Sequence, residues 1–477
     1  MGGPMPEHDL LAYRLGAITA PAGCGKTQII ADSLVGHAGP KPVLILTHTN
    51  AGVTTLRLRM QRGHVPPSTY RIATLDGFAM RLVSLFPGRS GIPPDTLQLR
   101  NPGADYPAIR LAAHRLAQSG HLNDTLTATY AHLVVDEYQD CNQAQHSLVT
   151  ALATVLPTCV LGDPMQAIFG FGGNQLVDWN VQVLQQFPLI GELNHPWRWI
   201  NAGTPQLGQW LLDCRSVLQV GGNVDLRTAP PEVTWIQLQH ATADRQRLSA
   251  ALTRSVTPQG QVLVIGDSRN PRGRRQMASQ TPGATAVEPV DLADLTSFGS
   301  AFSPEAPDAL GQLVQFAAET MTQVGAAALL IRLDILRRGT ARTPPTPAEA
   351  ALVAFAATPT YQLAADALRA LAQQDNARVY RPDVLYGCIR ALQMAEKGAC
   401  TFSAATVRER ERNRHENRQL ASRSIGSTLL LKGLEAEVAV IPSPENMDAR
   451  HLYVALTRGS TRIVVCSNTP ELVPQRS

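Results

Sequence analysis

The segment Ala20–Thr27, Ala-Pro-Ala-Gly-Cys-Gly-Lys-Thr, has the composition of a loop that binds phosphate. Gly23 and Gly25 allow the backbone to wrap around an anion, and the N–H groups at the start of a following helix point toward it. Lys26 can reach the β- and γ-phosphates of a nucleoside triphosphate, and the Thr27 hydroxyl can bind Mg²⁺. A chance glycine-rich turn is the alternative interpretation. We expect the nucleotide to contact the loop and the residue after it: Ala22, Gly23, Cys24, Gly25, Lys26, Thr27 and Gln28.

Two acidic residues, Asp136 and Glu137, directly follow the apolar run Leu133–Val135. Asp136 would hold Mg²⁺, and Glu137 would orient and deprotonate an attacking water. A lone acidic pair after a strand is more often only a solvated strand end. Because this pair follows a phosphate loop, the catalytic interpretation is favoured, and the two segments together predict an enzyme that hydrolyses ATP with Mg²⁺.

The elements that must position these residues are short apolar runs alternating with helical patterns. Each run is short enough to be a buried strand, and the runs are Ala17–Ala20, Val43–Thr47, His132–Val135 and Thr158–Leu161. Strands buried on both faces and alternating with helices are typical of a parallel α/β sheet. Ligands of such sheets bind at the carboxyl ends of the strands, where the polar segments lie.

Composition sets the class of protein but does not decide its partner. The chain has 477 residues, 44% hydrophobic and 17% charged, with a net charge of +4, which neither requires nor excludes nucleic acid. Its 7 cysteines include no C-x-x-C pair, which argues against disulfides, zinc and iron–sulfur clusters. No signal peptide is visible, and no apolar run reaches about 18 residues. We therefore expect a soluble cytoplasmic protein.

Length and pattern changes predict more than one domain. We predict a first domain over 1–200, with a small insertion at about 86–125 that is rich in Pro, Gly and Arg. A second domain would combine 201–285 with 420–477, because strand patterns occur at Gln261–Gly266, Val438–Ile441 and Arg462–Cys466. The Ala- and Leu-rich segment 286–419 would be a helical insertion.

With these residues identified, the chain resembles superfamily 1 helicases of the UvrD/Rep/PcrA type over 17–200 and 425–466. Segments similar to motifs Ia, Ib, II, III, IV, V and VI occur in the family's order: Leu46–Ala51, Ala73–Phe78, Asp136–Gln145, Gly162–Phe171, Leu193–Arg198, Leu431–Glu435 and Leu452–Arg458. One such match would be weak evidence, whereas the ordered set is strong evidence.

The resemblance implies two RecA-like domains with ATP in the cleft between them. It implies that Gln166 senses the γ-phosphate and that Arg198 and Arg458 act as arginine fingers, stabilising charge on the transferred phosphoryl group. Trp197 would stack on adenine. In motif V, Gly433 and Glu435 would contact the nucleotide, with Glu435 at the ribose.

The same resemblance implies single-stranded or tailed duplex DNA as a partner. Phe169 and Phe171 match aromatic residues that stack on bases, a contact worth about 1–3 kcal/mol per base for any sequence. Ordinary core packing is the alternative for both. Thr47, Asn50 and Thr74 would contact phosphates, or would only cap the ends of strands and helices.

Several positions depart from the family pattern. The glutamine with which the family reads adenine, upstream of the phosphate loop, is not evident in this sequence. Gln28 occupies the position after the loop where the family commonly has an Arg. On the DNA side Asp76, Gly172 and Leu429 replace residues better able to donate to phosphates.

The leading hypothesis is an ATP-dependent DNA translocase or helicase that moves 3′ to 5′ by family analogy. The second hypothesis is a nucleotide-gated regulatory subunit of a partner nuclease. Compact helicases of this branch accompany OLD-type nucleases in antiphage defence systems such as Gabija.

Overall fold

The computed structural model describes residues 9–170, 174–415 and 421–476. The chain divides into two compact units. The first contains Met1–Trp235, Pro444–Ile463 and Thr469–Ser477, and the second contains Ile236–Ser443 and Val464–Asn468. The finer division into two domains with two insertions stays a prediction.

The first unit is built on a parallel sheet of 6 strands in the order β3-β2-β4-β5-β1-β6. Its strands are β1 (Leu15–Thr19), β2 (Val43–Thr47), β3 (Tyr70–Thr74), β4 (Leu133–Val135), β5 (Thr158–Gly162) and β6 (Leu189–Glu192). One strand, β5, therefore separates the strand before the phosphate loop from the strand before the acidic pair.

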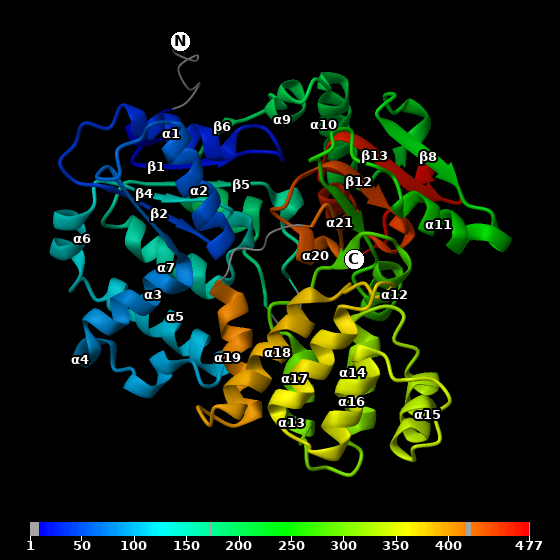
Figure 1. Cartoon of the computed structure of the whole chain (residues 1–477). Helices are drawn as coiled ribbons and strands as arrows, with labels where there is room; N and C mark the ends of the chain where they lie inside the picture. Colours follow the sequence, from blue (N-terminus) through cyan, green and yellow to red (C-terminus); the bar gives the residue numbers. More distant parts are fainter. Residues whose placement is uncertain (1–8, 171–173, 416–420, 477) are drawn as a thin grey trace. The chain divides into compact units, whose positions relative to one another are not determined.

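Helices cover both faces of this sheet. Alternate residues of β2 enter different cores: Leu44 and Leu46 pack in one layer, and Val43 and Ile45 in the other. This two-sided burial is why the central strands are continuous apolar runs. The helices of the unit are α1 (Lys26–Val35), α2 (Asn50–Arg62), α3 (Leu75–Leu85), α4 (Pro87–Ser90), α5 (Pro102–Gln118), α6 (Asn123–Thr129), α7 (Gln143–Ala153), α8 (Leu184–Gln186), α9 (Trp197–Asn201), α10 (Pro205–Gln219) and α21 (Ala449–Leu456) (Figure 1).

The second sheet has 6 strands in the order β10-β11-β9-β12-β13-β8, with its first four strands mutually parallel. The strands are β8 (Val233–Gln237), β9 (Val262–Ile265), β10 (Ala284–Ala286), β11 (Arg423–Gly426), β12 (Ala436–Ile441) and β13 (Gly459–Ser467). A small antiparallel pair joins β7 (Val224–Asp225) to β14 (Glu471–Leu472) in the first unit.

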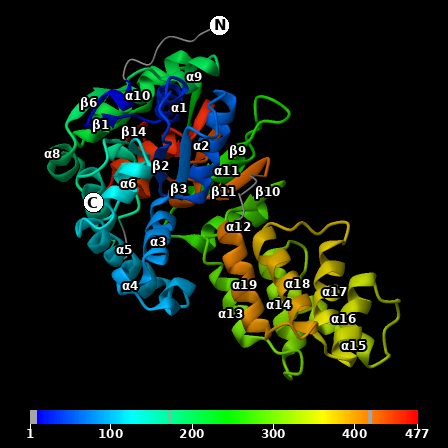
Figure 2. The same cartoon turned by 90° about the vertical axis from the view of Figure 1, so that its left-hand side faces the viewer.

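The second unit also contains a helical layer with its own apolar core. Helices α13 to α19 lie together in both views (Figures 1 and 2), and their buried side chains form one cluster. The helices of the unit are α11 (Ala243–Ala251), α12 (Pro271–Gln280), α13 (Ala293–Ala301), α14 (Ala309–Thr320), α15 (Ala326–Arg337), α16 (Pro347–Ala357), α17 (Tyr361–Ala372), α18 (Pro382–Glu396), α19 (Phe402–His415) and α20 (Thr428–Leu431). Among the helices described, none is both long and apolar enough to cross a membrane.

The predicted α/β class with two parallel-sheet cores is confirmed by these topologies. The strands expected at Val43–Thr47 and Thr158–Leu161 are present as β2 and β5. The edge strands β3 and β6 were not predicted, because they mix polar with apolar residues and are only partly buried. Burial on both faces makes a central strand easy to recognise, and an edge strand lacks this signal.

Asp76 of α3, one of the departures from the family pattern, forms an ion pair with α5. Arg110 of α5 donates from Nε to Asp76 Oδ1 and from Nη2 to Oδ2, both at 2.7 Å. Gln145 adds a third contact to Oδ1 at 3.2 Å. The carboxylate is therefore engaged as an acceptor inside the unit.

Arg110→Ala is expected to lower the free energy of unfolding of the first unit by about 1–3 kcal/mol, because Asp76 loses both guanidinium donors. All 5 tryptophans lie in this unit, so their fluorescence during urea denaturation reports its unfolding. Arg115→Ala, an exposed position on the same helix, is the matched control. Equal midpoints for the two variants would contradict the prediction.

Candidate nucleotide-binding site

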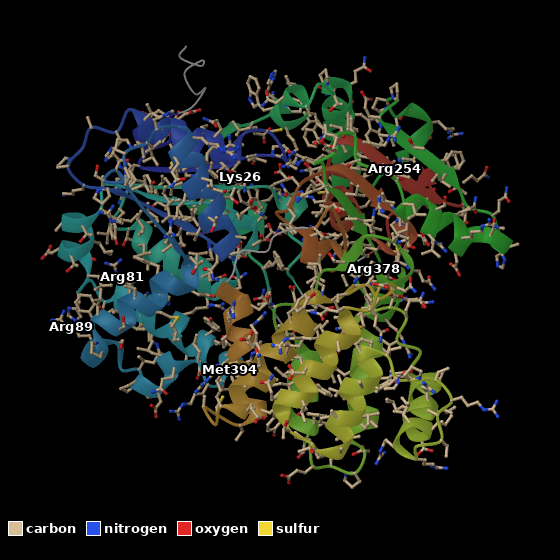
Figure 3. The ribbon with its side chains drawn as sticks, in the orientation of Figure 1. Lys26, Arg81, Arg89, Arg254, Arg378 and Met394 are labelled. Carbon is tan, nitrogen blue, oxygen red and sulfur yellow. The ribbon has the colours of Figure 1, made fainter. Side chains whose placement is uncertain are left out.

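The phosphate loop connects β1 to α1 and depends on two glycines with positive φ. Gly23 has φ +72° and Gly25 has φ +90°, a region that other residues rarely adopt. A Cβ on Gly23 would lie 2.5 Å from Trp199 Cζ3, and one on Gly25 would lie 3.2 Å from Trp197 Cδ1. The loop is thus a tight turn packed against Trp197 and Trp199, and α1 begins within it at Lys26, which is labelled in Figure 3.

Lys26 meets both predicted acidic residues. Its Nζ lies 2.9 Å from Asp136 Oδ1 and forms a second ion pair with Glu137 Oε1. Burial alone would lower the pKa of Lys26, but the two carboxylates outweigh it and raise that pKa above its usual value. The structure therefore brings the cation of the loop and the acidic pair to one point at the carboxyl end of the sheet.

The donor set at this point fits Mg²⁺ with a nucleotide. Mg²⁺ in such sites uses one or two protein oxygens and takes its other ligands from phosphates and water. Thr27, at the start of α1, and Asp136, after β4, supply one hydroxyl and one carboxylate. Across the described residues no cluster of His, Cys, Asp and Glu could hold a metal ion by itself.

The two carboxylate oxygens of Glu137 have different partners, Lys26 at Oε1 and Gln139 at Oε2. Its backbone is left-handed, with φ 57° and ψ 38°, at the start of the short turn Tyr138–Asp140. Gln139 donates from Nε2 to Glu137 Oε2 at 2.6 Å, and Gln139 Oε1 accepts the N–H of Asp163 at 3.1 Å. Gln139 was not among the predicted site residues, although it lies inside the segment resembling motif II. Its position links that segment to the segment resembling motif III.

Gln166 lies at the end of a short turn that follows β5. Its Nε2 donates to Asp163 Oδ2 at 3.1 Å, and both side chains are buried. The other oxygen of Asp163 accepts from Arg215 of α10, from Nε at 3.1 Å and from Nη2 at 2.9 Å. The predicted phosphate sensor is therefore attached to a buried ion pair that includes a residue absent from the predicted set.

Arg198, a predicted arginine finger, contacts the phosphate loop through its backbone. Its N–H donates to the Gly23 carbonyl at 3.1 Å, and its Nη1 donates to the Thr457 carbonyl at 2.7 Å. The other predicted finger, Arg458, donates from Nε to the Val454 carbonyl at 2.9 Å and is buried. Because Arg198 reaches the residue before Arg458, the two predicted fingers lie in one neighbourhood.

Helix α21 contacts the loop, and the start of β13 contacts Trp199 beside it. The Ala22 N–H donates to the Tyr453 hydroxyl at 3.1 Å, and Trp199 Nε1 donates to the Gly459 carbonyl at 2.9 Å. Burial, followed by the Asp163 carboxylate, raises the pKa of the Cys24 thiol to about 12. Tyr453 therefore contacts the backbone of the loop directly, and Cys24 is a buried packing residue.

Trp197 remains available for stacking. Its side chain is 43% exposed, packs edge-to-face on His195 at 4.3 Å between ring centroids, and lies next to Gly25. Gln28 is engaged elsewhere, donating to Asp32 at 2.7 Å and accepting from Arg59 at 3.0 Å.

Gly433 and Glu435 belong to the second unit, and Glu435 is exposed there. Gly433 has φ +79°. Their contacts with the nucleotide stay predictions.

The residues predicted to contact DNA are only partly brought together. Thr47 and Thr74 are paired across β2 and β3, so both lie at the carboxyl edge of the sheet. Thr74 accepts the Gly77 N–H at 3.0 Å and caps α3, as the alternative interpretation proposed. Asn50 is exposed at the start of α2, and Phe169 is half-buried. Phe171 and Gly172 lie outside the described residues.

Comparison with known proteins gives one family match over a minor part of the chain. The model of the UvrD/REP helicase N-terminal domain matches residues 95–180. This stretch contains Asp136, Glu137, Asp163 and Gln166, and it begins after the phosphate loop. Among curated proteins none matches.

Two solved helicase structures show distant likeness. The complex of Arterivirus nonstructural protein 10 (helicase) with DNA has 8% identity and a TM-score of 0.36, covering 96% of this chain and 62% of that one. The Pif1 helicase from Candida albicans has 12% identity and a TM-score of 0.29, covering 53% and 54%. The chain spans less than two thirds of either structure, and TM-scores this low do not establish a common fold. The similarity to helicases therefore rests on the matched UvrD/REP segment.

Proposed function

We propose that this protein is an ATP-dependent DNA helicase or translocase that couples ATP hydrolysis to movement on single-stranded DNA. The observation that carries the proposal is the meeting of Lys26 with Asp136 and Glu137, with Gln166 connected to the same cluster through Asp163 and Gln139. A generic phosphate site needs only the loop and the acid. The added amide and the two arginines are what a hydrolytic motor requires, because charge developing on a phosphoryl group must be stabilised.

Each residue has a separate role in this proposal. Glu137, fixed by Gln139, orients the attacking water and accepts its proton. Lys26 leaves its ion pairs with the carboxylates and binds phosphate oxygens. Thr27 and Asp136 would hold Mg²⁺, which when bound supplies positive charge between the phosphates. Arg198 and Arg458 would act at the γ-phosphate, where Gln166 distinguishes ATP from ADP.

DNA as the partner is supported by the match to the UvrD/REP model and by the ordered motifs. Phe169 is half-buried, and an aromatic ring at this place would stack on a base of any sequence. Thr47 is only 1% exposed and Thr74 caps α3, so these two predicted phosphate contacts add no support. Movement from 3′ to 5′ follows from family resemblance, and the partner nuclease stays a prediction of the sequence.

The proposal is tested by ATP hydrolysis with and without single-stranded DNA. We expect oligonucleotides to stimulate hydrolysis, and Lys26→Ala to abolish both the basal and the stimulated rate. Duplexes with 3′ or 5′ single-stranded tails then test polarity, with strand separation expected only from the 3′ tail. Equal hydrolysis in the presence and absence of DNA would overturn the motor and leave a DNA-independent ATPase.

A further inference from the structure

Asp163 is the centre of a buried polar network behind the phosphate loop. Its side chain is 0% exposed, and its two oxygens are divided between different partners. Oδ2 accepts from Gln166 Nε2 at 3.1 Å, whereas Oδ1 accepts the Met165 N–H at 3.1 Å and the guanidinium of Arg215. One carboxylate therefore fixes both the backbone turn that carries Gln166 and the orientation of its amide.

Within the described residues, Arg215 is the one cation that forms an ion pair with this carboxylate. Its side chain is 13% exposed, and its Nη1 donates to Gln219 of the same helix at 3.2 Å. Burial alone would lower the pKa of Arg215, but the Asp163 carboxylate outweighs it and raises that pKa. A buried carboxylate whose cation is removed is strongly unfavourable, so the position of Asp163 depends on Arg215.

The pair lies against the nucleotide loop. Burial, followed by the charge of Asp163, raises the pKa of both the Cys24 thiol and the Tyr453 hydroxyl, and Tyr453 accepts the Ala22 N–H at 3.1 Å. The N–H of Asp163 is bound by Gln139, which also holds Glu137. A displacement of Asp163 would therefore reach both the γ-phosphate sensor and the water-activating carboxylate.

We propose that Arg215 is a positioning residue of the ATPase, which acts through Asp163 to hold the Gln166 amide toward the γ-phosphate. Arg215 itself touches neither nucleotide nor water in this proposal. Its helix α10 packs on both α9 and α21, which carry Trp197, Arg198 and Tyr453. The ion pair thus connects the sensor to the helices that enclose the loop. This inference rests on the proposed ATPase and adds the residue that fixes its sensor.

A double-mutant cycle between Arg215 and Gln166 tests the inference. Gln166→Ala is expected to lower kcat for basal ATP hydrolysis by roughly 10²-fold, as removal of one stabilising donor does. Arg215→Ala is expected to lower kcat by about 10²-fold through misplacement of that donor. Because both act through one amide, the double variant should be no slower than Gln166→Ala alone.

The affinities of the same variants for fluorescent ATP and ADP analogues give a second, independent measurement. The wild type should prefer the ATP analogue, and Arg215→Ala should remove this preference as fully as Gln166→Ala does. Arg215→Lys keeps the charge but offers a single donor group, so we expect partial recovery of kcat. It also replaces Arg215→Ala in the cycle if the latter does not fold. Gln209→Ala, exposed on the same helix, is the control.

Additive losses, or an ATP preference retained in both Arg215 variants, would overturn the positioning role. The cycle uses basal hydrolysis and nucleotide binding, so its outcome is separate from that of the DNA experiment. A protein that hydrolyses ATP without DNA stimulation would refute the motor but would still decide the role of Arg215. If the wild type hydrolysed no ATP, equal binding of the two analogues would refute the sensor network as well.

Discussion

Glu137→Gln is expected to lower the rate of ATP hydrolysis by roughly 10²–10⁴-fold while leaving ATP binding intact or stronger. The amide cannot accept a proton from water, but its oxygen can still accept from Gln139 Nε2, so the local structure is kept. The change also removes one of the two negative charges that Lys26 contacts, which leaves the ammonium more available to phosphate.

Single-turnover hydrolysis and equilibrium binding of a fluorescent ATP analogue separate the two effects. Glu305→Gln, the same exchange at an exposed position in the second unit, is the control and should match the wild type in both assays. A variant that fails to bind the analogue would show that Glu137 serves the structure of the loop. A variant that hydrolyses ATP at the wild-type rate would show that another residue is the base.

Arg458→Ala is expected to reduce kcat by about 10³-fold or more, the range found when an arginine finger is lost. Its guanidinium donates to the end of α21, to the Val454 carbonyl and the Thr457 hydroxyl, and is nearly fully buried. In the proposed mechanism it must exchange at least one of these contacts for the γ-phosphate. Arg458→Lys keeps the charge without the planar fork and should recover only a small part of the activity.

Steady-state ATP hydrolysis with saturating single-stranded DNA checks this prediction, because a group acting in the transition state changes kcat more than KM. Arg462→Ala, exposed on the following strand, controls for loss of a nearby positive charge. A large rise in KM with an unchanged kcat would assign Arg458 to ground-state binding. A lowered thermal midpoint with normal kcat would assign it to the structure of α21 alone.

The central strands and the phosphate site could be predicted because single segments carry their signals. β2 and β5 are uninterrupted apolar runs, and the loop from Ala20 to Thr27 needs only local residue types. Arg215 had no such signal. It lies in an ordinary amphipathic helix, 52 positions from Asp163, and only the folded structure brings the two together.

Asp76 could be predicted in part, because the sequence shows the residue to be unusual but does not show its partner. The sequence identified it as a departure from a known pattern, with an acceptor where the family has a donor. Its partner Arg110 lies in the segment 86–125 that was treated as an insertion of unknown role. Because nothing in a single sequence pairs a carboxylate with one particular arginine, the fastening of α5 to α3 could not be foreseen.

The order of strands in the first sheet has a consequence for the protein during its synthesis. β1, which leads into the phosphate loop, pairs only with β5 and β6, more than 130 residues later in the chain. A later segment of the chain supplies Tyr453, whose hydroxyl accepts the Ala22 N–H of the loop. Contacts so distant in sequence form late, whereas the segments between them emerge from the ribosome first. A nascent chain therefore carries the loop without a completed site until the segment that contains Tyr453 has been made, and the proposed hydrolysis of ATP cannot begin before then.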